Sequence, residues 1–217
     1  MGMQSVSKQT LERLPLYLNY LKSLPKDEVP NISATVIAEK LGLNDVQVRK
    51  DLAMISSGGR PKIGYITADL TADIERFLGY GNADRAVIIG AGHLGQALLC
   101  YQGFLDYGLD VVAAFDTDKR IIGAEFGGKQ VLPIEKLPEL CRRMKIRMGI
   151  IAVPASAAQL VCDQLIESGI MAVWNFAPVY LKVPKDVLVQ NENMAYSLAV
   201  LSKHLTQRMG EVQSAGG

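Results

Sequence analysis

A glycine-rich turn is the segment of this sequence best suited to hold a ligand. The apolar run Ala86–Ile89 is followed at once by Gly90-Ala91-Gly92-His93-Leu94-Gly95. In such a turn the first glycine permits a tight bend after a strand, the second lets the backbone approach a pyrophosphate, and the third lets the next helix pack closely. The free N–H groups at the start of that helix would bind the phosphates. The turn therefore predicts a dinucleotide site.

An acidic residue stands at the distance that such a site requires. Asp116 ends the next apolar run, twenty-one residues beyond Gly95. A carboxylate there accepts a hydrogen bond from the ribose 2′-OH and repels a 2′-phosphate, which favours NAD over NADP. Lys119 and Arg120 lie nearby and would match the charge of a 2′-phosphate, so NADP remains an alternative. Ala152-Val153-Pro154, after a later apolar run, is the expected contact for the other half of the dinucleotide, although a simple strand end explains it equally well.

The residues that a dehydrogenase would need are not arranged in this sequence. Such an enzyme requires a group that moves the substrate proton and usually a cation that holds the substrate. None of the tyrosines is followed four residues later by a lysine, and His93 and His204 fit incidental solvent-facing positions better than catalytic ones. The three cysteines are far apart in apolar helical patterns, which argues against a disulfide framework or a metal site. We therefore predict a ligand site without catalytic residues and without a metal.

The segment before the turn has the pattern of a helix-turn-helix. Ser33 and Asn44 are expected to cap two short helices, and Gly42 is expected to end the first of them. A further helix is predicted before them, from Thr10 to Leu24. In the second short helix Val48, Leu52 and Ile55 share one face, so that Gln47, Arg49 and Lys50 lie on the other side.

A basic hairpin is predicted after these helices. The glycine-rich turn 57–62 carries Arg60 and Lys62, and the strand-like run 63–67 follows it, before a helix at about 71–78. Between Lys40 and Tyr65 five cations face only two carboxylates. A solvated charged face is the simpler explanation for isolated charges, but this order of elements favours DNA contact, with the second helix in the major groove. The predicted DNA-binding residues are Gln47, Arg49, Lys50, Arg60 and Lys62.

The remaining chain predicts an α/β domain. Apolar runs at 86–89, 111–115, 149–153 and 172–174 alternate with helical segments near 94–105, 136–144 and 155–168. Continuous apolar runs suit parallel strands that helices cover on both faces, as in a Rossmann-type doubly wound sheet. We therefore expect a winged helix-turn-helix DNA-binding domain at 1–80, a dinucleotide-binding domain at 83–193, and a terminal helix at 194–210.

The terminal helix has an apolar stripe with two possible uses. Met194, Leu198, Leu201 and Leu205 recur at spacings of four, three and four. The stripe would pack either on its own sheet or on a second subunit, and two-fold DNA sites call for a dimer.

Composition narrows the class of protein further. The 217 residues are 49% hydrophobic and 21% charged with a net charge of +1, as expected for a globular protein without an overall attraction to nucleic acid. No run is long and apolar enough for a membrane span, and the N-terminus lacks the pattern of a signal peptide. Together with the unpaired cysteines, this predicts a cytoplasmic protein.

These motifs together resemble the Rex family of redox-sensing transcriptional repressors. The resemblance extends in family order through nearly the whole chain, and the strings at 47–52 and 175–178 are highly specific. The matching pieces are Arg13-Leu14-Pro15-Leu16-Tyr17, Gln47-Val48-Arg49-Lys50-Asp51-Leu52, Gly64-Tyr65, Gly90–Gly95, Phe115-Asp116, Asn175-Phe176-Ala177-Pro178 and Val183-Pro184.

The resemblance implies a homodimer that binds operator DNA, with NADH and NAD⁺ as regulatory ligands and a C-terminal helix swapped between subunits. NADH would bind more tightly than NAD⁺ and release the DNA. Tyr101 would lie near the nicotinamide, and Asn193 stands where many members have an aspartate that pairs with this tyrosine. The wing segment 54–59 also departs from the version with Phe-Gly that many relatives have. A small NAD-dependent oxidoreductase with an accessory helical domain is the alternative.

Overall fold

The computed structural model describes residues 6–25, 28–80 and 84–215. It divides into two compact units, Met1–Asn82 and Ala83–Gly217, which we call unit 1 and unit 2. The predicted linker covers 79–82, and its residues 81 and 82 lie outside the described part of the chain, as does residue 83.

Unit 1 is a helical domain with a small two-stranded sheet. Its elements are α1 (Lys8–Ser23), β1 (Asn31–Ile32), α2 (Ala34–Leu41), α3 (Asp45–Ile55), β2 (Tyr65–Ile66) and α4 (Thr67–Leu78). The predicted caps are confirmed: Ser33 accepts from the Val36 amide, Asn44 accepts from the Gln47 amide, and Gly42 is left-handed with φ 64°. One apolar core joins the helices and contains Leu14, Tyr17, Leu18, Ile37, Val48, Leu52, Leu70 and Ile74.

The region after the wing differs from the prediction. The strand is limited to Tyr65–Ile66, which pairs antiparallel with Asn31–Ile32, and the predicted run 63–67 was too long. The following helix begins at Thr67, four residues before the predicted start. The Thr67 hydroxyl donates to the Val29 carbonyl at 2.7 Å and its amide donates to the Pro30 carbonyl at 2.9 Å. These contacts fix the helix start on a distant segment, which local periodicity does not reveal.

Unit 2 contains a seven-stranded sheet in the order β5-β6-β4-β3-β7-β8-β9. The strands are β3 (Asp84–Ile89), β4 (Leu109–Asp116), β5 (Glu125–Phe126), β6 (Lys129–Pro133), β7 (Met148–Ile151), β8 (Ala172–Asn175) and β9 (Leu188–Asn191). All pairings are parallel except that of β5 with β6 at one edge. The order reverses between β3 and β7, which makes this a doubly wound sheet with its switch point beside β3.

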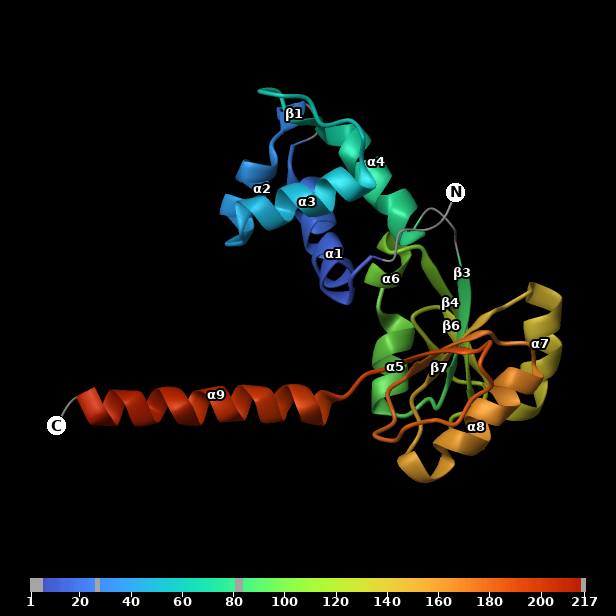
Figure 1. Ribbon diagram of the computed structural model, residues 1–217. Helices are drawn as coiled ribbons and strands as arrows, with labels where there is room; N and C mark the ends of the chain where they lie inside the picture. Colours follow the sequence, from blue (N-terminus) through green and yellow to red (C-terminus); the bar gives the residue numbers. More distant parts are fainter. Residues whose placement is uncertain (1–5, 26–27, 81–83, 216–217) are drawn as a thin grey trace. The chain divides into compact units, whose positions relative to one another are not determined.

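Helices cover both faces of this sheet (Figure 1). They are α5 (His93–Cys100), α6 (Gly103–Asp106), the 3-10 turn η1 (Ile134–Lys136), α7 (Leu137–Met144) and α8 (Ala155–Glu167). One core packs α7 and α8 on one face, and a second packs α5 and α6 on the other. The predicted helix 94–105 is two helices that meet at Tyr101, the C-cap of α5.

The last helix, α9, spans Met194–Ala215 and is longer than the predicted 194–210. Every side chain described in it, from Met194 to Met209, is exposed. Leu198, Leu201 and Leu205 are 64%, 65% and 58% exposed. The apolar stripe is therefore unburied within a single chain.

Candidate functional site

The predicted dinucleotide residues meet at the carboxyl ends of three strands. The amide of Gly90, after β3, donates to Phe115 of β4 at 2.8 Å. The amide of Ala152, after β7, donates to Ile89 of β3, also at 2.8 Å. In open α/β sheets this edge, at the switch point, is where ligands bind. The structure thus brings together the glycine turn, Asp116 and Ala152.

The three glycines of the turn have different surroundings. Gly90 has φ +98°, and a Cβ there would lie 2.6 Å from the Ala152 carbonyl oxygen. A Cβ on Gly95 would collide with the Gly90 carbonyl oxygen. At Gly92 no atom of the described residues lies within 4 Å of the Cβ position, so its lack of a side chain leaves open space in front of α5. Gly90 and Gly95 are therefore required by the fold itself, whereas the fold does not exclude a side chain at position 92.

The N-terminus of α5 offers backbone donors to that space. Gly92 is the N-cap and, within the described chain, no side chain caps the helix, so the first amides, those of His93 and Leu94, have no partner within the helix. The Ala91 amide is engaged, because it donates to the Asp116 Oδ2 at 2.8 Å. Amides without a partner at a helix start are the kind of donor that binds phosphate groups.

Asp116 ties the glycine turn to the loop after β4. Besides the Ala91 amide, its carboxylate accepts from the amides of Thr117 at 2.7 Å and Asp118 at 2.9 Å. Arg120, one of the two cations that would match a 2′-phosphate, pairs with Asp118 at 2.6 Å. The side-chain hydrogen bond from Arg120 lowers the pKa of Asp118 to about 2. Arg120 is therefore already matched by Asp118, whereas Lys119, the other cation that matches a 2′-phosphate, takes no part in this pair.

Tyr101 is half exposed at the end of α5. Its ring meets Phe104 edge-on with centroids 4.9 Å apart, and Phe104 meets Trp174 at 5.7 Å. Asn193 caps α9, since its Oδ1 accepts from the Tyr196 amide at 2.9 Å. An amide oxygen caps a helix as well as a carboxylate does, and Asn193 does so without a charge.

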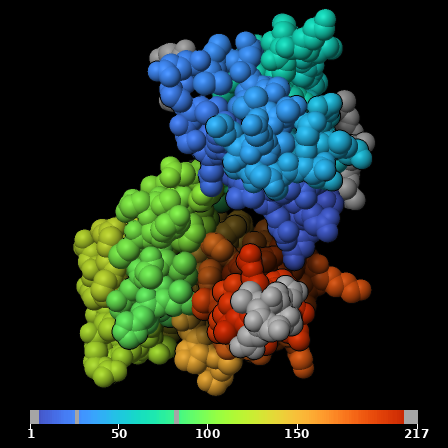
Figure 2. All heavy atoms as spheres, turned by 90° about the vertical axis from the view of Figure 1, so that its left-hand side faces the viewer, coloured from blue at the N-terminus to red at the C-terminus, as the bar shows by residue number. Residues whose placement is uncertain are grey.

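The predicted DNA-contacting residues of α3 are differently placed. Val48 and Leu52 are fully buried, and Lys50 is exposed on the far side of the helix, as predicted. Arg49 pairs with Asp45 at 2.8 Å. The atoms of this segment form part of the surface of unit 1 that is light blue in Figure 2.

Sequence reasoning missed one residue on that exposed face. Val46, one turn before Lys50, is 58% exposed. An exposed apolar side chain on a recognition helix can contact a thymine methyl group. The sequence did contain a signal for Val46, because a residue four positions before Lys50 lies on the same side of a helix.

A buried carboxylate, also missed, ties α3 to α1. Asp51 is 1% exposed and accepts from Arg13 Nε at 2.7 Å, Arg13 Nη2 at 3.0 Å, Tyr17 at 2.8 Å and Thr10 at 3.2 Å. Gln47 also donates to it, at 2.9 Å. Burial alone would raise the pKa of Asp51, but the hydrogen bonds from Arg13, Tyr17 and Gln47 outweigh burial and lower it. Burial and the bond to Asp51 raise the pKa of Tyr17 to about 12.

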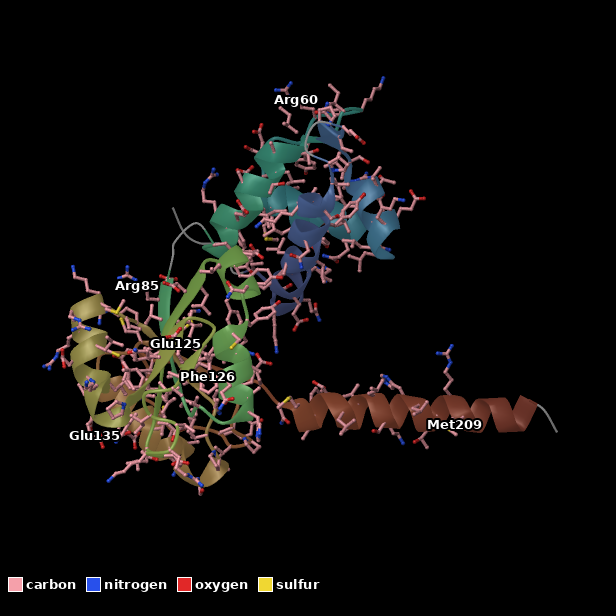
Figure 3. The ribbon with its side chains drawn as sticks, turned by 180° about the vertical axis from the view of Figure 1, so that it is seen from behind. Arg60, Arg85, Glu125, Phe126, Glu135 and Met209 are labelled. Atoms are coloured by element: carbon pink, nitrogen blue, oxygen red, sulfur yellow. The ribbon has the colours of Figure 1, made fainter. Side chains whose placement is uncertain are left out.

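The predicted basic hairpin, which carries the two wing cations Arg60 and Lys62, is tight and is closed by a bridge between Arg60 and Gly64. The Arg60 amide donates to Gly64 at 2.8 Å, and the Gly64 amide donates back at 2.9 Å. Lys62, at the bend, has φ 68°, a left-handed conformation that is rare for a lysine. Arg60 lies at the outer edge of unit 1 in Figure 3. Both wing cations are exposed, as predicted.

Known proteins share this combination of a glycine turn and a helix-turn-helix. A family model described as "CoA binding domain" matches residues 82–179, and one described as "Putative DNA-binding protein N-terminus" matches 5–53. The redox-sensing transcriptional repressor Rex of Pelotomaculum thermopropionicum is 41% identical over 203 residues, 94% of this chain and 95% of the relative. That of Treponema denticola is 42% identical over 192 residues, 88% and 91% of the two chains. The chain belongs to the Rex family of redox-sensing transcriptional repressors.

Solved Rex-family structures agree with this membership. RSP, a Rex-family repressor, in complex with β-NAD⁺ and operator DNA has a TM-score of 0.88 at 34% identity, with 99% of each chain covered. RSP in complex with β-NADH has a TM-score of 0.83 at 34% identity, with 97% of this chain and 99% of that chain covered. The relatives are Rex repressors and not enzymes, so the alternative of a small oxidoreductase is rejected. Among the described residues, no helix is long and apolar enough to cross a membrane.

Proposed function

We propose that this Rex-family chain is a cytoplasmic repressor that binds operator DNA as a homodimer and releases it when NADH binds. Residues 1–80 would bind DNA, 83–193 would bind the dinucleotide, and 194–210 would form the dimer. The observation that carries the proposal is the open space at Gly92 in front of α5, within a chain that also presents an exposed helix-turn-helix.

The residues of unit 2 fit a dinucleotide. The amides at the start of α5 would hold the pyrophosphate, and Asp116 would accept from the adenosine ribose. Asp116 would exchange part of its present loop contacts for that hydroxyl. The stretch 152–154 and Tyr101 would line the nicotinamide half. NADH and NAD⁺ differ in the charge and planarity of the nicotinamide ring, so discrimination must arise at this half of the site.

The residues of unit 1 fit duplex DNA. Lys50 on α3 would enter the major groove, and Arg60 and Lys62 of the wing would contact phosphates or a narrow minor groove. Arg49 is paired with Asp45 and would have to leave this partner to contact a base or a phosphate. RSP was crystallised with operator DNA, which supports the same partner for this chain.

The exposed stripe of α9 supports a dimer. Leucines at this spacing bury well against another helix or sheet, and a monomer would leave them in water. A swapped terminal helix would place the stripe on the second subunit.

Release of DNA by NADH requires only that NADH bind two conformers of the protein with different affinities. A ligand shifts an equilibrium by no more than its differential affinity for the two states. NADH therefore releases DNA if it binds the conformer with low DNA affinity more tightly than the conformer that fits the operator. By reciprocity, operator DNA must weaken NADH binding by the same factor.

Fluorescence anisotropy tests this proposal. The protein is titrated onto a labelled fragment of its own upstream DNA at fixed salt, and NADH or NAD⁺ is then added, because phosphate contacts make affinity depend on salt. Release by NADH but not by NAD⁺ is expected. Binding that ignores both nucleotides would contradict the regulatory part of the proposal.

A further inference from the structure

The contact between Gln47 and Asp51 carries information about which base the recognition helix reads. Gln47 is the third residue of α3, near the end of the helix that meets base edges in helix-turn-helix proteins. Its side chain does not turn back to the helix start. Instead, its Nε2 lies 2.9 Å from Asp51 Oδ1, one helical turn further on.

The chemistry of Asp51 determines which way the carboxamide faces. An ionised carboxylate can only accept hydrogen bonds, so the nitrogen of Gln47 must face it and the oxygen must face away. A carboxamide flipped by 180° would set two oxygens against each other. The orientation of Gln47 is therefore fixed by its partner.

Asp51 cannot rotate to follow Gln47. The guanidinium of Arg13 contacts both of its oxygens, and the hydroxyls of Tyr17 and Thr10 add one bond to each. These three donors lie on α1, so the carboxylate is anchored by a different helix from the one that carries Gln47. Gln47 is held against a rigid acceptor and keeps its Oε1 and one N–H for another partner.

That remaining pair of groups matches adenine. Glutamine reads adenine by accepting from N6–H with its oxygen and donating to N7 with its nitrogen. Guanine presents two acceptors, O6 and N7, at the same edge, so the Gln47 oxygen, which faces away from Asp51, would meet O6 without a proton between them.

We propose that Asp51 is a positioning residue that fixes the carboxamide of Gln47 so that it reads adenine in preference to guanine at one operator position. The inference rests on the proposed DNA-binding function and deepens it. Lys50 and the wing cations supply affinity in this scheme, while the Asp51–Gln47 pair supplies discrimination at one base pair.

The test is a panel of operators with single base-pair changes, titrated with four proteins at one salt concentration. Wild type is expected to prefer A over G at one position by about 5- to 150-fold, the range of a bidentate contact. Gln47→Ala and Asp51→Asn are both expected to lose this preference at that position alone, because the amide introduced by Asp51→Asn can donate to the Gln47 oxygen and turn the carboxamide over. Tyr17→Phe is the control: it removes one donor to Asp51, but Arg13 still contacts both carboxylate oxygens and Thr10 still donates to one, so Gln47 stays in place and the preference is kept.

A second measurement needs no Asp51 variant and covers the case in which Asp51→Asn does not fold. Wild type and Gln47→Ala are compared on operators in which the adenine is replaced by 7-deazaadenine or by purine, which lack N7 and the N6 amino group respectively. Each analogue is expected to weaken binding by wild type and to leave Gln47→Ala unaffected.

Two outcomes would overturn the inference while leaving the repressor function intact. One is uniform weakening of all operators by Gln47→Ala, and the other is full A-over-G preference in a folded Asp51→Asn protein. Failure of wild type to prefer any operator fragment over unrelated DNA would instead overturn the proposed function, and the inference with it.

Discussion

Gly92→Val separates ligand binding from folding more cleanly than any other change in the glycine turn. The Cβ of residue 92 meets no described atom within 4 Å, and its φ of −69° and ψ of −172° suit a β-branched residue. The expected cost to folding is therefore the loss of glycine as N-cap of α5, about 0.5–1 kcal/mol. For a protein of this size this lowers the melting temperature by about 1–4 °C.

The cost to ligand binding is expected to be larger. The valine side chain would fill the space in which a pyrophosphate approaches the amides of α5. Loss of one charge-assisted hydrogen bond is worth about 1.5–3 kcal/mol, so the Kd for NADH should rise roughly 10- to 150-fold. Isothermal titration calorimetry measures this directly, and energy transfer from Trp174, the only tryptophan of the chain, gives an independent readout.

Gly95→Ala is the matched control. A Cβ there would run into the Gly90 carbonyl oxygen, so this smaller change should destabilise the fold by about 1–3 kcal/mol through overpacking. For Gly92→Val we expect weaker NADH binding with a nearly normal melting temperature. For Gly95→Ala we expect a lowered melting temperature. A Gly92→Val protein that binds NADH within about twofold of wild type would refute the assigned role of the turn.

Four further predictions concern DNA binding, stability, acid dependence and assembly. Lys50→Ala and Arg60→Ala should weaken operator binding and leave NADH affinity unchanged. If Arg60 contacts a phosphate, Arg60→Ala should also reduce the slope of log K against log salt by about 1. Anisotropy at several salt concentrations measures the operator affinity and this slope. Arg13→Ala should destabilise the protein by about 3–5 kcal/mol in urea unfolding, because it leaves the buried carboxylate of Asp51 uncompensated. The pKa of Asp51 is lowered in the folded state, so its stabilising effect should be complete above its unfolded pKa of about 3.9 and be lost as pH falls through the lower folded value; an acid titration of Asp51→Asn that shows the same dependence as wild type would contradict this. Leu201→Asp should shift the mass measured by sedimentation toward the monomer, and a mass equal to that of wild type would argue against α9 as the dimer contact.

Local signals were sufficient to predict most of unit 1. The caps Ser33 and Asn44 and the left-handed Gly42 act within one turn of their own residue, so the helix boundaries that they set could be read from neighbouring residues. The start of α4 could not, because Thr67 is fixed by carbonyls of Val29 and Pro30 on a distant segment.

The missed strands of unit 2 have a similar cause. β6 and β9 lack the continuous apolar run of the central strands and lie toward the two edges of the sheet: β9 alternates between exposed and half-buried residues, and β6 buries only Val131 fully. The break at Tyr101 was hidden because no proline or glycine lies between Gly95 and Tyr101, although Gly103 follows within two residues.

The two predicted sites differ in how much the sequence could reveal. The glycine turn and Asp116 lie in a spacing imposed by one strand-helix-strand unit, so sequence alone placed them together. The burial and hydrogen bonds of Asp51 depend on donors from α1, more than thirty residues away, which periodicity within α3 does not reveal.

Reciprocal linkage tests whether this one chain couples a dinucleotide site to a DNA-binding helix. The Kd for NADH is measured by calorimetry with the free protein and again with the protein saturated by its operator. We expect weaker NADH binding in the presence of operator, by the same factor by which NADH weakens the operator. An NADH affinity that is identical with and without operator DNA would contradict this coupling.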